Sequence, residues 1–421
     1  MSKEKPQALG FDEQRLARVG QTLKRDIESG KYHGASMMVA RKGKVVLDLV
    51  EGYSDREAGR RLAPDAVFST MSVAKQFTNV LALSLVERGA LRLHAPIAQW
   101  LPEFRAMGHE KVTLSHLLTH TSGICSAIPE LPPEVLTNIE QLTAYAASRP
   151  LESLPGERVN YSILVGHSVI GALCLRADGR GRTYSQMLEQ ELFAPLKMRD
   201  TSVGLRKDLV ERFCPVKAAW SGSGVIAPET VEGMNDFIRM PGAELPGGGC
   251  VSSIGDLHRF AEMLRRGGEL DGARILSPAL IDYASRNHTG ELRNVLFERI
   301  SQHAQLAPDS RVYRAGIFRA RRGRHSRPLQ RDELGARVRR PRRRLDRVLG
   351  RCGEGAIVRV PFHRADGRQL SPGATEPAFR SDPRIDRRVG QAVATSFGGV
   401  SSSRSRRSIS LGDRLKYFAS G

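Results

Sequence analysis

The sequence contains few cysteines and no long apolar run. Its five cysteines are scattered through 421 residues, and none has the Cys-x-x-Cys spacing of zinc ribbons or redox motifs. A small, odd and dispersed set argues against a disulfide framework and favours a reducing compartment. The longest apolar candidate, residues 80–86, is far shorter than the ~20 residues that a membrane helix needs. Because the first residues also lack the apolar core of a secretory signal, the sequence predicts a cytoplasmic protein with no membrane partner.

Positive charge is concentrated in one part of the chain. The formal net charge is +20, but residues 306–421 hold 27 Arg and one Lys against 10 acidic residues. Residues 1–305 hold 37 basic and 35 acidic residues and are therefore nearly neutral. A basic charge spread over a whole domain would favour a nucleic-acid partner. We expect such a partner only if the arginine-rich segment is a genuine part of the protein.

The change in composition predicts a boundary near residue 305. Residues 1–305 have the patterning of a folded domain, whereas residues 306–421 form an arginine-rich tail with thin aromatic content and no sustained periodicity. Such a tail buries too little apolar area to offset its ordering entropy, so little regular structure is expected there. Three explanations stay open: a reading-frame shift in a GC-rich gene, which is the preferred one, a fused basic segment, or an RNA-binding arm.

The first 305 residues alternate between strand-like and helix-like patterns. Residues 35–53 predict a β-hairpin with Gly43 at its turn. A capping-box pattern at Ser253 and Asp256 opens one of the helices, and Gly123 is expected to close another. Apolar residues at helical spacing predict helices over residues 12–29, 72–88, 112–124, 163–175 and 254–267.

A lysine stands inside the most apolar of these helices. In the stretch FSTMSVAKQFTN, Lys75 follows Ser72 by three residues, which places both side chains on one helix face. A buried cation is costly unless it is paired or used. A serine hydroxyl becomes a nucleophile when a neighbouring base accepts its proton, and a desolvated lysine can be that base. A second Ser-x-x-Lys, at Ser2 and Lys5, lies in a polar terminus without a helix. The pattern predicts Ser72 as nucleophile and Lys75 as base, against the alternative of chance.

Tyr161, in the stretch NYSI, is the third candidate. Structural tyrosines are common, and a buried one normally finds a partner for its hydroxyl. Beside a serine–lysine pair, the phenol can relay a proton between nucleophile and leaving group.

Four stretches together resemble a known family. FSTMSVAKQFTN, VTLSHLLTHTSGI, NYSI and PGGGCVSSIGDLHRFAEMLRRGGELDGARILSP occur in the order found in class C β-lactamases and penicillin-binding enzymes, and they are most similar to family VIII carboxylesterases. The resemblance covers about residues 10–305. It implies an α+β fold in which an antiparallel sheet flanked by helices stands beside an all-helical region, with the site at their junction. It also implies acylation of Ser72, with Lys75 and Tyr161 as the base system, followed by hydrolysis without a cofactor or metal.

Two departures from the family pattern bear on the substrate. The β-lactamases carry Asn two residues after the tyrosine, whereas Ile163 stands here and Ser162 follows Tyr161 directly. The Tyr-Ser pair resembles the esterases and favours esters over lactams. The third family box, a Lys-Thr-Gly or a variant of it on a late strand, is not evident, although residues 288–290 (His-Thr-Gly) and 396–399 (Ser-Phe-Gly-Gly) are weak candidates.

Three further patterns are interpreted as structural. Ser168, in GHSVIG, lies in a helical context and not in the strand–turn–helix of a Gly-x-Ser-x-Gly elbow. His116 and His120 have the spacing of a zinc helix, but the catalytic Glu of that motif is missing, so capping and packing roles are expected. The glycines at 247–249 are expected to form a turn that enters a strand.

The sequence thus predicts a serine carboxylesterase that hydrolyses short-chain acyl esters of small molecules. Two alternatives stay open. One is a binding or regulatory protein with an incomplete site and a basic nucleic-acid tail. The other is an acyltransferase or D-amino-acid peptidase that uses the same three residues.

Overall fold

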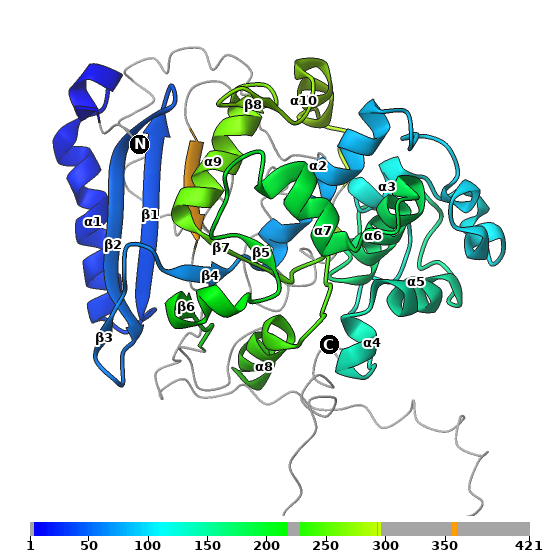
Figure 1. Cartoon of the computed structure of the whole chain (residues 1–421), viewed down its shortest axis with the longest axis horizontal. Coiled ribbons are helices and arrows are strands. Elements are labelled where there is room, and N and C mark those ends of the chain that lie inside the picture. Colours follow the sequence, from blue (N-terminus) through cyan, green and yellow to red (C-terminus); the bar gives the residue numbers. More distant parts are fainter. Residues whose placement is uncertain (1–3, 218–227, 293, 296–355, 361–421) are drawn as a thin grey trace, which may run out of the picture.

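The computed structural model of the protein describes residues 4–217, 228–292, 294–295 and 356–360. An antiparallel sheet with a helix on each face lies at one side, and a group of helices lies at the other (Figure 1). A small second sheet connects the two parts. The α+β architecture expected from the sequence is therefore confirmed, as is the all-helical region beside the sheet.

The larger sheet is built on the predicted hairpin. Strands β1 (Gly34–Arg41) and β2 (Lys44–Asp55) are joined by a two-residue turn in which Lys42 and Gly43 both have positive φ, 53° and 78°. This conformation matches the right-handed twist of a tight hairpin, and glycine adopts it without strain. The strand order is β10-β1-β2-β3, with every neighbour antiparallel, where β3 is Arg60–Arg61 and β10 is Ala356–Val360.

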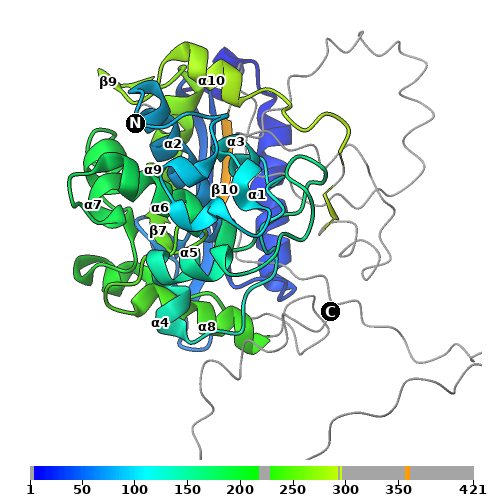
Figure 2. The same cartoon turned by 90° about the vertical axis from the view of Figure 1, so that its right-hand side faces the viewer.

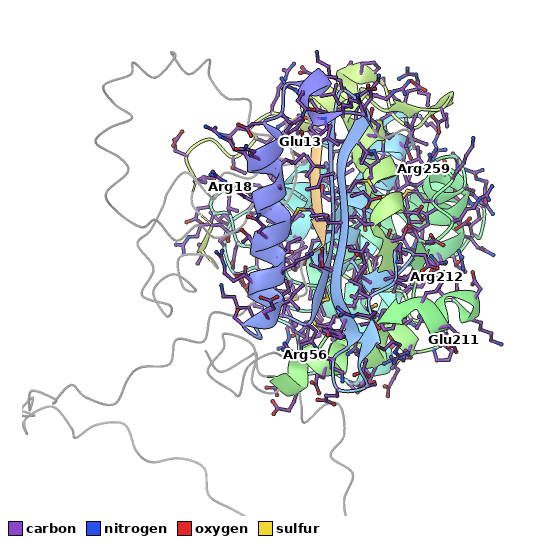
Figure 3. The ribbon with its side chains drawn as sticks, turned by 90° about the vertical axis from the view of Figure 1, so that its left-hand side faces the viewer. Glu13, Arg18, Arg56, Glu211, Arg212 and Arg259 are labelled. Atoms are coloured by element: carbon purple, nitrogen blue, oxygen red, sulfur yellow. The ribbon has the colours of Figure 1, made fainter. Side chains whose placement is uncertain are left out.

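Helices pack on both faces of this sheet. Helix α1 (Glu13–Glu28) packs Leu23 and Ile27 against Met37 and Val39, and Figure 3 shows it lying along the strands. Because successive side chains of a strand point to opposite faces, Met38 and Ala40 belong to the main core on the other face. Helix α9 (Ile254–Arg265) covers that face and contacts β1 and β10.

The second sheet brings two distant parts of the chain together. Its order is β5-β7-β4-β6, with strands Ser202–Val203, Cys250–Ser253, Val67–Ser69 and Phe213–Cys214. Strand β4 is parallel to β6 and antiparallel to β7. The chain leaves β4 directly before Ser72 and enters β7 from the predicted glycine turn, so these two segments lie side by side. A separate hairpin joins β8 (Glu269–Leu270) to β9 (Ala273–Arg274).

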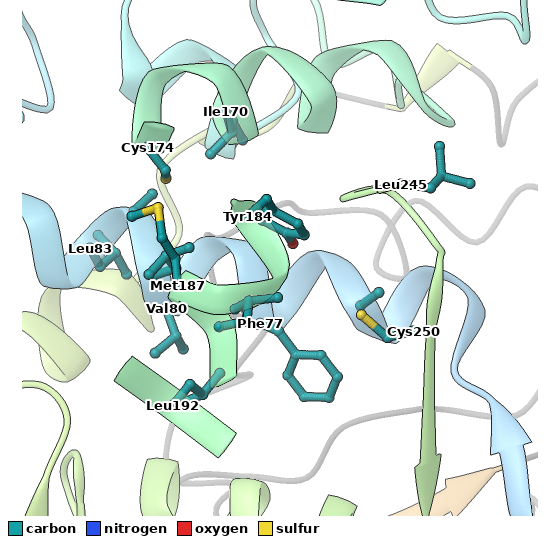
Figure 4. Close-up of a cluster of buried hydrophobic side chains, with 14 of the residues drawn as sticks. Phe77, Val80, Leu83, Ile170, Cys174, Tyr184, Met187, Leu192, Leu245 and Cys250 are labelled. Carbon is teal, nitrogen blue, oxygen red and sulfur yellow. The ribbon is translucent and has the colours of Figure 1, made fainter. Parts of the chain in front are cut away.

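Helix α2 (Ala74–Glu87) is the centre of the helical region, where Phe77 and Val80 are among its fully buried side chains (Figure 4). The surrounding α-helices are α3 (Leu114–Leu118), α4 (Pro133–Leu136), α5 (Ile139–Ala147), α6 (Val165–Asp178), α7 (Tyr184–Leu188), α8 (Pro228–Arg239) and α10 (Pro278–Ala284). Short 3₁₀ turns span Pro6–Leu9, Met71–Val73, Ile97–Gln99, Pro102–Arg105, His109–Lys111 and Lys207–Arg212, and a π turn spans Glu189–Phe193. None of the helices in the described ranges combines the length and apolarity needed to cross a membrane.

Two predicted elements differ from the structure. The helix expected over residues 112–124 ends at Leu118, because His120 takes a left-handed conformation with φ 57° before Gly123 is reached. The capping box of α9 is half formed: Ser253 accepts the backbone N–H of Asp256, but the Asp256 carboxylate accepts from the backbone N–H of Asp200 instead of returning to the cap.

Most of the arginine-rich tail, residues 306–421, lies outside the described residues. Strand β10 is the exception, and it pairs with β1 from Ala40↔Ala356 to Ser36↔Val360. The expectation of little regular structure after residue 305 is therefore wrong at these five residues. A domain boundary at residue 305 stays a prediction.

Candidate active site

Ser72 and Lys75 lie where strand β4 passes into helix α2. Met71, which precedes the serine, has φ 47°, a conformation that is uncommon for a side chain of this size. The turn exposes Ser72 at the start of the helix, whereas Lys75 is only 2% exposed. The Nζ atom of Lys75 lies 3.3 Å from Oγ of Ser72. The predicted placement of both side chains on one face is confirmed.

Two main-chain carbonyls hold the buried lysine. Nζ of Lys75 donates to the carbonyl oxygen of Ile163 at 2.8 Å and to that of Gly247 at 2.6 Å. These acceptors satisfy two N–H groups, so the remaining position on the nitrogen faces Ser72. As an ammonium, Lys75 donates a hydrogen bond there, and as a free amine it presents its lone pair to the serine hydroxyl. The geometry thus fits a base aimed at the serine proton.

The turn at residues 245–249 is fixed against α2 by a buried hydroxyl pair. Thr78, one turn beyond Lys75, donates to the carbonyl of Pro246 at 3.0 Å and lies 2.7 Å from the hydroxyl of Tyr184. Figure 4 shows Tyr184, Leu245 and Cys250 around α2. A Cβ atom at Gly247 would lie 3.0 Å from the Ile163 carbonyl oxygen. Glycine therefore allows both carbonyls to approach the lysine. The predicted turn before β7 thus supplies a hydrogen-bond acceptor to Lys75, a role that the glycine-rich sequence did not indicate.

Tyr161 completes the cluster from the loop that precedes α6. Its hydroxyl donates to Oγ of Ser72 at 2.8 Å. Its ring centroid lies 5.1 Å from Nζ of Lys75. Tyr161, which is 89 residues from Ser72 in the sequence, therefore meets Lys75 at the Ser72 oxygen.

The two histidines of the zinc-like pattern have different surroundings. His116 completes a capping box at the start of α3, where its Nδ1 accepts from the backbone N–H of Thr113. His120 stacks on Tyr161, with ring centroids 4.6 Å apart. Capping is thus confirmed for His116 and packing for His120. Within the described part of the chain, no group of three His, Cys, Asp or Glu residues could hold a metal ion.

Ser162 and Ser168 are both engaged in structural hydrogen bonds. Ser162 donates to the carbonyl of Cys125 at 2.8 Å and accepts the backbone N–H of Gly166 at 2.9 Å, which satisfies the start of α6. Ser168 is 1% exposed, and its hydroxyl faces the Leu164 carbonyl within the helix. Neither arrangement resembles an activated nucleophile.

A strand-borne third box is absent from the residues that the structure describes. None of the strands from β1 to β10 carries a Lys-Thr-Gly, His-x-Gly or Trp-Gly-Gly triplet. The His-Thr-Gly at 288–290 follows α10 in a turn, and His288 bonds to the carbonyl of Tyr283 at 2.8 Å. The other candidate, residues 396–399, lies outside the described residues.

Comparison with known proteins establishes the family. Residues 19–297 match the beta-lactamase family model. Esterase EstB of Burkholderia gladioli is 32% identical over 317 residues, which cover 68% of this chain and 78% of that protein. The chain therefore belongs to the beta-lactamase family, and it is a serine hydrolase of that family.

Solved structures agree on the fold. A family VIII carboxylesterase superposes with a TM-score of 0.56 at 24% identity, covering 66% of this chain and 77% of that one. A penicillin-binding protein homologue from Caulobacter crescentus gives a TM-score of 0.57 at 25% identity, covering 68% and 78%. The predicted family resemblance is confirmed.

Proposed function

We propose that this protein is a carboxylesterase that hydrolyses short-chain acyl esters through an acyl-enzyme on Ser72. The observation that carries the proposal is the convergence of Lys75 Nζ and the Tyr161 hydroxyl on the Ser72 oxygen, at 3.3 Å and 2.8 Å. Ser72 is exposed to an incoming ester, whereas the base beside it is buried. Such a pairing of exposed nucleophile and oriented base is what nucleophilic catalysis requires.

During acylation the Ser72 proton is transferred twice. Lys75 and Tyr161, acting as one unit, accept the Ser72 proton while Oγ attacks the ester carbonyl carbon. When the tetrahedral intermediate collapses, the carbon–alkoxy bond breaks and the leaving alcohol takes that proton. The backbone N–H of Ser72 is one expected donor to the oxyanion.

Deacylation repeats the step with water. The Lys75–Tyr161 unit takes a proton from water, whose oxygen bonds to the acyl carbon. The bond from that carbon to Ser72 Oγ breaks, the carboxylic acid leaves, and the proton returns to Ser72. The step needs no metal or cofactor.

The position of Ile163 supports esters over lactams. In the β-lactamases of this group the corresponding residue is Asn, whereas here the main-chain carbonyl of Ile163 contacts Lys75 and its side chain packs against the core. No side-chain amide is therefore offered to a lactam substrate from this position. The similarity to an esterase at 32% identity points the same way.

Butyrate and acetate esters of p-nitrophenol should be hydrolysed with a higher kcat/KM than the chromogenic cephalosporin nitrocefin. The ratio should be at least about 10²-fold, the scale of the rate loss when one polar group that stabilises the transition state is missing. Ser168→Ala serves as the matched control and should leave ester turnover unchanged. Faster turnover of nitrocefin than of the butyrate ester would contradict the proposed substrate class.

Gly247→Ala should lower kcat/KM for these esters about tenfold, because the added methyl presses on the Ile163 carbonyl and disturbs the two acceptors of Lys75. Gly20→Ala is the control: its new methyl would lie 3.4 Å from the flexible Leu49 side chain, in the middle of α1. That substitution should leave kcat/KM unchanged and add up to about 1 kcal/mol of stability. Equal kinetics for the two variants would show that the carbonyl geometry does not matter.

A further inference from the structure

His120 contacts the chain on both sides of Tyr161. Its carbonyl accepts the backbone N–H of Asn160 at 2.9 Å, and its ring Nδ1 accepts the backbone N–H of Ser162 at 3.2 Å. Between these bonds, the imidazole stacks on the Tyr161 ring at 4.6 Å, with 38° between the ring planes. One residue therefore fixes the backbone before and after Tyr161 and also one face of its ring.

The backbone of His120 is itself held in an uncommon conformation. Its φ of 57° is left-handed, a region in which His and Asn occur more often than most non-glycine residues. The end of α3 holds it there, because the N–H of His120 donates to Leu117 at 3.1 Å and the N–H of Thr121 donates to His116 at 2.8 Å. This conformation ends the helix and lets the carbonyl and the ring of one residue reach the same loop.

A second histidine connects the stack to the helix that carries Lys75. The His167 ring lies 5.3 Å from the His120 ring, and its Nε2 donates to the side-chain oxygen of Asn79 at 3.1 Å. Asn79 stands one turn beyond Lys75 on α2. The rings of Tyr161, His120 and His167 thus form a layer that ends on the catalytic helix.

His120 is neutral in this layer. Because Nδ1 accepts a hydrogen bond, the ring proton is on Nε2. Burial, and after it the neighbouring Lys75, lowers the pKa of His120 to about 3. The imidazole therefore acts through its acceptor and its ring face rather than through a charge, and its role stays the same across the neutral pH range.

We propose that His120 is the positioning residue for Tyr161, holding the tyrosine hydroxyl at the Ser72 oxygen. The inference rests on the proposed function, in which that hydroxyl shares the proton of Ser72. Tyr161 lies in an irregular loop, so its own backbone does not fix its ring, and a displacement of about 1 Å can lower a rate by about 10²-fold. The three contacts of His120 supply the missing constraint.

The test is a double-mutant cycle between His120 and Tyr161, measured as kcat and KM for p-nitrophenyl butyrate. His120→Asn keeps an acceptor near the Nδ1 position and tolerates positive φ, but it removes the ring. His120→Phe keeps a ring and removes the acceptor. Each should lower kcat by about 10-fold to 10²-fold with KM within about threefold, because a positioning residue acts on the transition state through Tyr161.

In the Tyr161→Phe background, the same His120 substitutions should change kcat by less than about threefold, because the hydroxyl that His120 positions is gone. His116→Ala is the control, since the His116 ring caps α3 and is not part of the stack on Tyr161, and its small effect should be the same in both backgrounds. If the bulky Phe at positive φ prevents folding, the Asn variant decides alone.

Equal losses from His120→Asn with and without the Tyr161 hydroxyl would mean that His120 merely supports the loop, and the inference would be wrong. Wild-type kcat in both His120 variants would overturn it as well. Wild-type kcat in Tyr161→Phe alone would instead reject the proposed role of Tyr161, so the two failures can be told apart.

Discussion

Replacing Ser72 with alanine is expected to lower kcat for p-nitrophenyl butyrate by about 10³-fold or more, as for other catalytic nucleophiles. The substitution removes the oxygen on which Lys75 and Tyr161 converge, so the acyl-enzyme of the proposed mechanism cannot form. The loss should appear in kcat, because substrate binding does not depend on the hydroxyl. Steady-state kinetics at high enzyme concentration measure the residual rate.

The fold should survive this change. Ser72 is exposed, so its truncation leaves no buried cavity, and the melting temperature should stay close to that of the unaltered protein. A Ser72→Ala protein that melts normally and still hydrolyses the ester at the original rate would reject Ser72 as nucleophile. The Ser168→Ala variant would then have to be tested as the alternative.

Lys75→Ala and Tyr161→Phe should each lower kcat by about 10²-fold to 10³-fold, and the double variant should lose little more than either single one. In the proposed mechanism the two side chains handle one proton as a unit, and effects within such a unit are strongly non-additive. The measurement is the complete cycle of four proteins under single-turnover conditions, which isolates acylation from product release.

The two single variants should differ in their free energy of unfolding. Lys75 is 2% exposed, and its removal leaves the carbonyls of Ile163 and Gly247 without their buried donor, so unfolding should become easier by about 1–3 kcal/mol. Tyr161→Phe removes only the hydrogen bond from the tyrosine hydroxyl to Ser72 Oγ, so it should lower the free energy of unfolding by less. If the two kinetic losses simply add, Lys75 and Tyr161 do not share a proton, and the mechanism needs a different base.

The local part of the site could be predicted from the sequence. The spacing of Ser72 and Lys75 is set by the helix itself, and the apolar residues around them are enough to place the lysine in the interior. The hairpin of β1 and β2 was equally accessible, because Gly43 and period-2 patterning are local signals. Helices α1, α6 and α9 were found near their observed positions for the same reason.

The groups that aim the lysine could not be predicted. The carbonyls of Ile163 and Gly247 lie 88 and 172 residues from Lys75, and every residue type has such a carbonyl. Only the fold brings them to the same nitrogen. The role of His120 could not be predicted for a related reason. The pattern of VTLSHLLTHTSGI continues a helix past Leu118, and the contact of the His120 ring with the loop of Tyr161 joins residues 42 positions apart.

Strand β10 could not be predicted from the average composition of the tail. Averaged over residues 306–421, the abundance of arginine argues against packed structure, yet Ala-Ile-Val-Arg-Val at 356–360 contains three β-branched residues that favour a strand. Among the strands that the structure describes, this one stands at the end of the sheet order, beside β1 (Figure 2). The hypothesis of a shifted reading frame for the tail stays open, whereas Ser72, Lys75 and Tyr161 all lie well before the tail begins.

The central claim is that the acyl group of the substrate is carried by Ser72. The most direct measurement is mass spectrometry of the protein after a short incubation with p-nitrophenyl butyrate and acid quenching, followed by tryptic digestion. Cleavage at Arg61 and Lys75 gives the peptide 62–75, in which fragmentation distinguishes Ser72 from Ser69 and Thr70. We expect a butyryl adduct on Ser72 that is absent from the Ser72→Ala protein. Steady turnover with the adduct on another residue, such as Ser168, would contradict the account.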